Sequence, residues 1–136
     1  MYGTTRAYSE KNRQMIKKRM EEIIEGVSNS FNAIIKIKYK EGYPPTVNHD
    51  LPVKNVLLAA KDIVGDQAKT PYLSMGSEDF SYYLQKIPGC FFFIGSAPKK
   101  NDMLSTPHHC SHFDIDERSL LVGASVYLNL IENSFK

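Results

Sequence analysis

Cysteine is scarce in this sequence: only Cys90 and Cys110 occur among 136 residues. Two cysteines do not form the dense disulfide framework of a small secreted domain. Cys90 lies in an apolar run and is expected to be a buried thiol that is not bridged to Cys110 in the far loop. These features favour a reducing compartment, so we expect the protein to be cytoplasmic.

Long apolar runs are also missing. No stretch approaches the roughly 18 residues that a membrane-spanning helix requires, which argues against membrane association. The first residues, MYGTTRAYSEKNRQ, have no apolar core and do not resemble a signal peptide. Internal repeats and low-complexity segments are absent as well. The composition, with 42% apolar and 24% charged residues, is that of an ordinary globular protein.

The net charge is small, at +2 with neutral histidines, and gives no reason to expect a nucleic-acid partner. Its distribution is uneven. Residues 1–43 contain nine Lys and Arg against five Asp and Glu, whereas residues 44–136 contain eight against ten. The change falls at the sequence Gly-Tyr-Pro-Pro, residues 42–45, which predicts a domain junction.

An amphipathic helix is predicted over residues 10–31. Ser9 is a favoured N-cap, and Glu10 suits the positive end of the helix dipole. The basic residues of this segment are best explained as a solvated helix face. The apolar residues recur at helical spacing and are Ile16, Met20, Ile23, Ile24, Val27 and Phe31.

Strands are predicted on both sides of this helix. Residues 2–8 are rich in Thr and Tyr. Between residues 34 and 41, apolar side chains alternate with lysines, which indicates a strand with one solvated face. A sheet of two strands and one helix is too small to be stable by itself, so a partner for this sheet is expected.

The remaining residues have the pattern of an α/β domain. Helices are predicted over 51–64, 78–87 and 117–133, the second with Ser77 as its N-cap. Residues 90–95 form a continuous apolar run, typical of a strand that is buried on both faces. A polar loop, residues 95–112, follows it. The apolar residues expected to face inward in the last helix are Leu120, Leu121, Ala124, Tyr127, Leu128 and Ile131.

Three of the four histidines lie in the sequence PHHCSHFDID. They are His108, His109 and His112, with Cys110 between them. Imidazole and thiolate are good ligands for zinc and similar ions, and ligands of open α/β sheets bind beyond the carboxyl ends of strands. Neighbouring histidines in a loop are also common as plain surface residues, so the pattern alone leaves both interpretations open.

A second candidate is the sequence SMGSEDF, residues 74–80. A Gly-Ser turn at the start of a helix exposes backbone N–H groups that can bind an anion. An ordinary capped helix start explains the same residues, with Glu78 and Asp79 complementing the helix dipole. By spacing alone, the ordinary helix start is the better explanation.

Four motifs in order carry a family resemblance: GTTRAYSE, GYPPTVNHD, MGSEDFSYYLQKIPGCFFFIG and PHHCSHFDIDE. They resemble the C-terminal stretch of zinc-dependent amidohydrolases of the aminoacylase/carboxypeptidase type, which include hippurate hydrolases, N-acyl-amino-acid amidohydrolases and auxin-conjugate hydrolases. The resemblance implies a metallopeptidase-like α/β catalytic domain with a ferredoxin-like α+β lid domain. Residues 1–43 would be part of the lid, and residues 44–136 the C-terminal part of the catalytic domain.

The resemblance also implies site residues. His109 matches a metal ligand of a site that holds two divalent ions in the intact protein, either zinc or manganese, cobalt or nickel. Gly76, Ser77 and Glu78 match a loop in the wall of the active site, which implies substrate binding. Arg6 matches the arginine of a Gly-Thr-x-Arg strand in the lid, and we expect it to have a structural role.

The family's general base and its other metal ligands fall upstream of this stretch, so no catalytic residue is predicted here. We therefore expect an incomplete part of an enzyme that cleaves the amide bond of N-acyl amino acids or small peptides. Such a part would associate with the missing N-terminal part or form a homodimer through the lid. Two alternatives stay open: a non-catalytic module that assembles with a partner chain, and a small His/Cys metal-binding protein.

Overall fold

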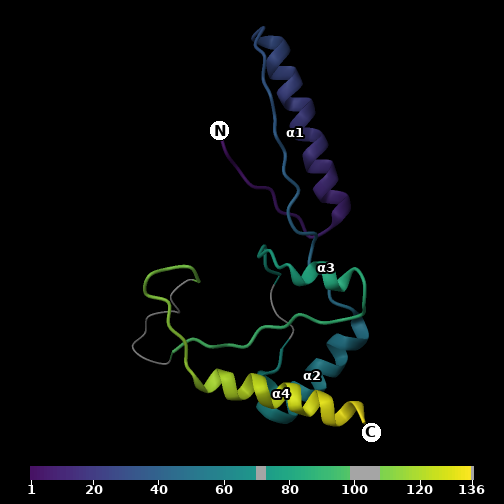
Figure 1. Ribbon diagram of the computed structural model, residues 1–136, viewed down its shortest axis with the longest axis vertical. Coiled ribbons are helices and arrows are strands. Elements are labelled where there is room, and N and C mark those ends of the chain that lie inside the picture. The colour runs from purple at the N-terminus through teal and green to yellow at the C-terminus, as the bar shows by residue number, and fades with distance from the viewer. Residues whose placement is uncertain (70–72, 99–107, 136) are drawn as a thin grey trace. The chain divides into compact units, whose positions relative to one another are not determined.

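The computed structural model describes residues 1–69, 73–98 and 108–135 (Figure 1). Over these ranges the regular elements are helices. They are α1 (Glu10–Ser30), α2 (Asp50–Val64), the short 3-10 helix η1 (Gly65–Gln67), α3 (Phe80–Leu84) and α4 (Arg118–Ser134). None of these helices is long and apolar enough to cross a lipid bilayer. Part of the predicted polar loop, residues 99–107, lies outside the described residues.

The chain divides into two compact units. The N-terminal unit comprises residues 1–47 and 73–88, and the C-terminal unit comprises the described parts of residues 48–72 and 89–136. The segment that contains α3 therefore groups with α1. The family domain boundary after residue 43 stays a prediction.

Helix α1 forms as predicted. Ser9 is its N-cap, with an extended backbone, and the Ser9 Oγ accepts a hydrogen bond of 3.2 Å from the backbone N–H of Asn12. This bond satisfies one of the N–H groups that a helix start leaves without a partner. The face that contains Met20 and Ile24 is half-buried, whereas Phe31 at the end of the predicted helix is exposed.

The prediction of strands over residues 2–8 and 34–41 is wrong for the described residues. A strand exists only through hydrogen bonds to a neighbouring backbone. The structure joins the two segments instead by a side-chain contact, 2.7 Å between Thr5 Oγ1 and Tyr39 Oη. Thr5 and Tyr39 are half-buried, but the alternation predicted for residues 34–41 is not reflected in burial, because Ile35 and Ile37 are exposed like the lysines beside them.

Helix α3 is shorter than the predicted 78–87. Tight turns continue it at both ends: the N–H of Ser81 binds the carbonyl of Glu78, and the N–H of Lys86 binds that of Tyr83, each three residues earlier. The N-cap is Asp79 rather than Ser77. Pro88, which cannot donate a backbone hydrogen bond, follows these turns.

The third predicted strand, residues 90–95, is also not formed within the described residues. The backbone groups at its start bind a neighbouring loop instead. His49 N–H donates to the carbonyl of Gly89 over 3.0 Å, and the N–H of Gly89 donates to His49 Nδ1 over 3.1 Å. The side chain of Asn48 binds the backbone of Phe91 in the same way, so side chains take the place of a neighbouring strand.

Helices α2 and α4 pack against each other and form the core of the C-terminal unit. Ala59 of α2 is fully buried, and Val126 of α4 is 3% exposed. The Asn129 side chain donates to the carbonyl of Ala59 and to Asp62 Oδ2. Small residues therefore allow the two helices to approach closely, and one amide group links them.

The predicted inward face of α4 is wrong. Its large members, Leu120, Leu121, Tyr127, Leu128 and Ile131, are between 54% and 73% exposed, and Ala124 is exposed too. The buried residues are Gly123 and Val126. Helix α4 has apolar residues on more than one face, and hydrophobic periodicity does not indicate which face a neighbour covers.

Candidate functional site

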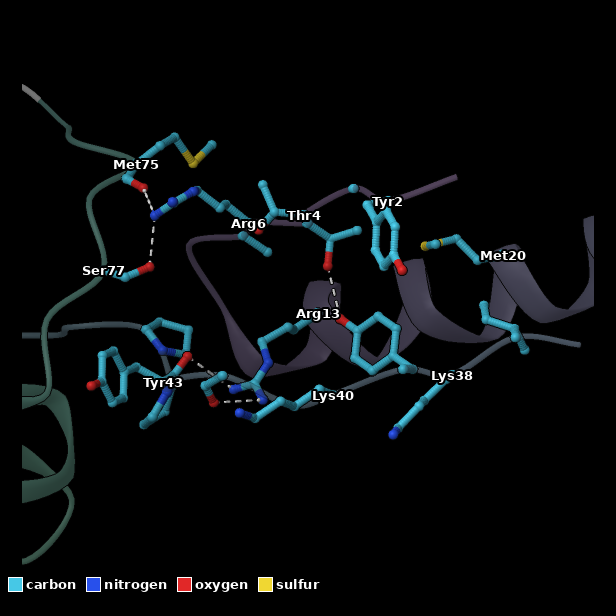
Figure 2. A pocket seen from close by; sticks show the side chains of 18 of the residues that line it. Tyr2, Thr4, Arg6, Arg13, Met20, Lys38, Lys40, Tyr43, Met75 and Ser77 are labelled. Atoms are coloured by element: carbon cyan, nitrogen blue, oxygen red, sulfur yellow. Dashed lines mark hydrogen bonds between the residues drawn. The ribbon is translucent and has the colours of Figure 1, made fainter.

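The loop before α3 is held by an arginine from the first segment of the chain (Figure 2). Arg6 Nη1 donates to the carbonyl oxygen of Met75 over 2.9 Å and to Ser77 Oγ over 2.7 Å. Arg6 thus connects the first residues of the chain to the loop before α3, and its structural role stays a prediction. The N-cap of α3 is Asp79, two residues after Ser77.

The three residues of the predicted substrate-binding loop differ in their surroundings. Gly76 and Ser77 are exposed and lie in the wall of a cavity, whereas Glu78 is half-buried. The N–H of Gly76 donates to Ser74 Oγ, and a methyl group at position 76 would lie 3.2 Å from that oxygen. A side chain at position 76 would require Ser74 Oγ to move by a few tenths of an ångström.

Glu78 takes part in the packing of α3 through its backbone. Its carbonyl oxygen accepts a hydrogen bond of 2.7 Å from Ser81 Oγ, and Ser81 is 1% exposed. This bond fixes the position of Glu78 at the start of α3. The structure therefore brings Gly76 and Ser77 together with Arg6, and it places Glu78 next to the buried face of α3.

The predicted metal ligand His109 lies in a turn over residues 108–112 and is exposed. Its φ of 65° falls in the left-handed region, where residues other than glycine are uncommon. The ring of His108 lies 6.5 Å from that of His109 and 5.1 Å from that of Phe113. The turn is closed by a hydrogen bond of 3.2 Å from Phe113 N–H to the carbonyl of Cys110.

Zinc sites in proteins have three or four protein ligands. Within the part of the chain that the structure describes, no three His, Cys, Asp or Glu side chains lie close enough to hold an ion. This includes His108, His109, Cys110 and His112, so the described residues do not support a local His/Cys metal site. By themselves, they also do not fit the two-ion site that the family resemblance implies.

Both thiols are free, as predicted. Cys90 and Cys110 are half-buried. Burial raises the pKa of the Cys90 thiol, because a low-polarity environment disfavours the charged thiolate. Cys90 is therefore a packing residue and not an activated nucleophile.

The comparison with known proteins decides the family. The sequence model of Peptidase family M20/M25/M40 matches residues 6–133. The chain belongs to this family. Both candidate loops, residues 74–80 and 108–112, lie within the matched range.

Curated relatives agree with this assignment. The chain is 35% identical over 127 residues to "Putative amidohydrolase YhaA" of Bacillus subtilis (strain 168), covering 93% of this chain and 32% of that protein. It is 36% identical over 138 residues to "IAA-amino acid hydrolase ILR1-like 6" of Arabidopsis thaliana, covering 96% and 29%. It is 36% identical over 135 residues to "Uncharacterized hydrolase SA1230" of Staphylococcus aureus (strain N315), covering 96% and 34%.

The chain thus spans about a third of the length of the curated relatives that it matches. No solved structure matches it. Membership of this family agrees with a metallopeptidase-like α/β domain, although the described residues themselves form only helices as regular elements.

One feature was not found from the sequence. The N-terminal unit contains a cavity that is lined on one side by residues 1–8 and on the other by residues 35–40. Five of the residues that line it are basic. The signal was present in the alternation of apolar residues and lysines over residues 34–41, from which the sequence predicts only a strand with one solvated face.

Proposed function

We propose that the protein of which these residues form part hydrolyses the amide bond of N-acyl amino acids or small peptides. The observation that carries the proposal is the family match over residues 6–133. The names of two relatives, an amidohydrolase and an IAA-amino acid hydrolase, support it. The first name describes hydrolysis of an amide, and the second describes hydrolysis of an IAA-amino acid.

Hydrolysis of an amide needs an activated water, stabilisation of the oxyanion and a group that moves a proton. In this proposal a divalent metal held in part by His109 would supply the first two, and a carboxylate from another part of the protein would act as the general base. The described residues contribute one candidate metal ligand, His109, and the other ligands come from the rest of the protein. We assign no catalytic residue to this chain.

The backbone of His109 supports its assignment as a ligand. A left-handed conformation at a residue other than glycine costs free energy and is found disproportionately at functional sites. Here it occurs in an exposed turn, where the imidazole is accessible to groups from another part of the protein.

Gly76 and Ser77 are proposed to contact the substrate, with Glu78 supporting them at the start of α3. Two observations support this proposal: Gly76 and Ser77 are exposed, and hydrogen bonds hold their loop to Arg6. We further propose that the protein is cytoplasmic. We also propose that it forms a homodimer through the lid or associates with an N-terminal part.

A chimera tests the proposal. These 136 residues replace the matching third of YhaA, and hydrolysis of N-acyl amino acids is measured with added zinc, manganese or cobalt. We expect activity that His109→Ala abolishes, because it opens the metal coordination, and that His108→Ala and His112→Ala reduce less. Equal loss from all three variants would favour a local histidine cluster instead.

The isolated chain provides the complementary measurement. Because the described residues do not assemble three metal ligands, we expect weak metal binding and no measurable amide hydrolysis from the 136 residues alone. Robust turnover by this chain would contradict the interpretation that it is an incomplete part of the enzyme.

A further inference from the structure

The residues at the predicted domain junction are held from two sides within the N-terminal unit. Arg13 of α1 donates from Nη2 to the carbonyl oxygen of Gly42 and from Nη1 to that of Tyr43, each over 3.3 Å (Figure 2). The ring of Tyr43 meets the ring of Tyr82 of α3 edge to face, with the ring centroids 5.7 Å apart. Pro44, the next residue, is buried. Tyr43 therefore connects α1 to α3.

Arg13 is well placed to hold this backbone. Its side chain is only 12% exposed, and its guanidinium also pairs with Glu10 over 3.0 Å and with Glu41 over 3.7 Å. A guanidinium has five N–H donors in one plane, so a single arginine can bind carboxylates and carbonyl groups together. The two carboxylates fix the arginine, and the arginine fixes the carbonyl oxygens of residues 42 and 43.

Tyr82 is connected to the loop before α3 by the hydrogen bonds of the first turns of this helix. The N–H of Tyr82 donates to the carbonyl oxygen of Asp79 over 3.0 Å. Ser81, which is 1% exposed, donates to the carbonyl oxygen of Glu78 with both its N–H and its hydroxyl group. A contact that holds Tyr82 in place therefore also holds Glu78, the last residue of the proposed substrate loop, residues 76–78.

This loop has a second attachment, at Arg6, which binds the carbonyl of Met75 and the hydroxyl group of Ser77. Arg6 contacts the loop directly, whereas Tyr43 reaches it only through α3. A segment that is held at one point can still turn about that point, and a second attachment fixes its orientation. The contact of Tyr43 with Tyr82 supplies that second attachment.

We propose that Tyr43 is a positioning residue for substrate binding: Arg13 holds it, and it acts through Tyr82 on the substrate loop. Its ring fixes α3, and α3 keeps Gly76 and Ser77 in the orientation in which they contact the substrate. A preorganised loop binds more tightly, because it loses less conformational freedom on binding. The inference rests on the proposed function for the role of this loop, whereas the coupling of Tyr43 to the loop does not.

Hydrogen exchange of the 136-residue chain tests the coupling. Tyr43→Ala should accelerate exchange at the amides of Ser81 and Tyr82 roughly two- to tenfold, the range that an edge-to-face aromatic pair implies. Tyr43→Phe keeps the ring and should exchange like the unchanged protein. Exchange in α2 and α4 reports any general loss of folding and should stay the same. Unchanged exchange at residues 81 and 82 in Tyr43→Ala, or an equal increase in Tyr43→Phe, would overturn the coupling.

A double-mutant cycle identifies the contact that is responsible. Tyr82→Ala should accelerate exchange at Ser81 as Tyr43→Ala does, and the double variant should show no further increase, because both substitutions remove the same ring contact. Additive effects would show that Tyr43 acts by another route and would overturn the proposal. The cycle also needs only variants that keep α1 and its hydrogen bonds to residues 42 and 43.

The contribution of Arg13 has its own matched control. Arg13→Met should also accelerate exchange at Ser81, because the carbonyls of residues 42 and 43 lose their donor. Lys17→Met should not, since Lys17 pairs with Glu41 over 3.0 Å and, among the described residues, makes no hydrogen bond to residues 42 or 43. Equal effects of the two variants would assign the anchoring to Glu41 and overturn the role of Arg13.

Kinetics of the YhaA chimera test the role in substrate binding. Tyr43→Ala should raise KM roughly two- to tenfold and change kcat by less than about twofold, because a loop that moves weakens binding and supplies no catalytic group. Tyr43→Phe should restore both parameters. Tyr2→Ala is the control, since the side chain of Tyr2 is fully exposed, and it should change neither.

A purely structural role of Tyr43 gives a different result. Tyr43→Ala would then lower kcat through loss of folded enzyme and leave KM unchanged, which would overturn the proposal. A chimera that is inactive with Tyr43 in place would instead refute the proposed function. The exchange experiment would still decide whether Tyr43 holds the loop.

Discussion

Asn48 binds the backbone of Phe91 with both ends of its side-chain amide. Its Nδ2 donates to the carbonyl oxygen of Phe91 over 2.8 Å, and its Oδ1 accepts from the N–H of Phe91 over 2.7 Å. This is the pair of hydrogen bonds that a neighbouring strand makes with one residue. A single side chain thereby holds the apolar segment that begins at Cys90 next to the start of α2.

Loss of this amide should destabilise the C-terminal unit. In Asn48→Ala, both backbone groups of Phe91 lose a partner in a partly buried place, which costs about 1–3 kcal/mol. Urea denaturation measures the change in the free energy of unfolding. Asn55→Ala, at an exposed position on α2, is the control and should change the stability by less than about 0.5 kcal/mol. Equal effects would contradict a special role for Asn48.

A methyl group at Gly123 should destabilise the contact of α4 with Ile94. A Cβ at this position would lie 2.6 Å from Ile94 Cδ1, which forces one of the two to move. Because Ile94 Cδ1 is the end of a flexible side chain that is 36% exposed and can turn aside, and because alanine gains helix propensity, we expect a net loss in Gly123→Ala of less than about 1 kcal/mol. Ile94→Val removes Cδ1, so the double variant Ile94→Val/Gly123→Ala should recover most of the lost stability.

Gly26 provides the matched control for that substitution. It is also a helical glycine, in α1, but nothing lies within 4 Å of a Cβ built on it. Gly26→Ala should therefore stabilise α1 by about 0.5–1 kcal/mol through helix propensity alone. Thermal or urea unfolding measures both variants, and a loss of stability here would show that the space around Gly26 is not open.

Lys17 and Glu41 form an ion pair in which each group should shift the pKa of the other. The hydrogen bond and the charge of Lys17, 3.0 Å away, hold the pKa of Glu41 below its usual range, and Glu41 raises the pKa of Lys17. The contribution of Glu41 to stability is thus present above its ordinary pKa and is lost as pH falls through the lowered value. That of Lys17 is lost as pH rises through the raised value.

NMR titration of the Glu41 carboxyl group checks this pair. Lys17→Met should return the pKa of Glu41 toward the ordinary value, while Lys11→Met, at an exposed position on the same helix, should leave it unchanged. High salt should also weaken the shift, because the pair is exposed. An unchanged pKa in Lys17→Met would show that another group is responsible.

The two cysteines should differ in reactivity. Thiol titration under denaturing, non-reducing conditions should detect two free thiols. In the folded protein, Cys90 should react slowly with iodoacetamide at neutral pH, because its raised pKa leaves little thiolate. Mass spectrometry after a timed reaction measures this. Fast modification of Cys90, or a bridge to Cys110, would contradict the structure.

The sequence alone determined the helices α1, α2 and α4 and the family. Local signals were sufficient for these: the Ser9 cap of α1, the glycine that ends α2 at residue 65, and the periodicity of α4 all act within a few residues along the chain. Four ordered motifs were sufficient for the family resemblance, which the match over residues 6–133 confirmed. The assignment of His109 as a metal ligand stays a prediction.

Only the tertiary structure decided which surfaces are covered and which backbone groups are paired. Both faces of α4 carry apolar residues, and contact with α2 buries the one that contains Gly123 and Val126. Residues 2–8 and 34–41 have strand-like sequences, yet a strand needs a neighbour, and the structure places a cavity between them. Helix formation is local, whereas burial and strand pairing depend on groups far away in the chain.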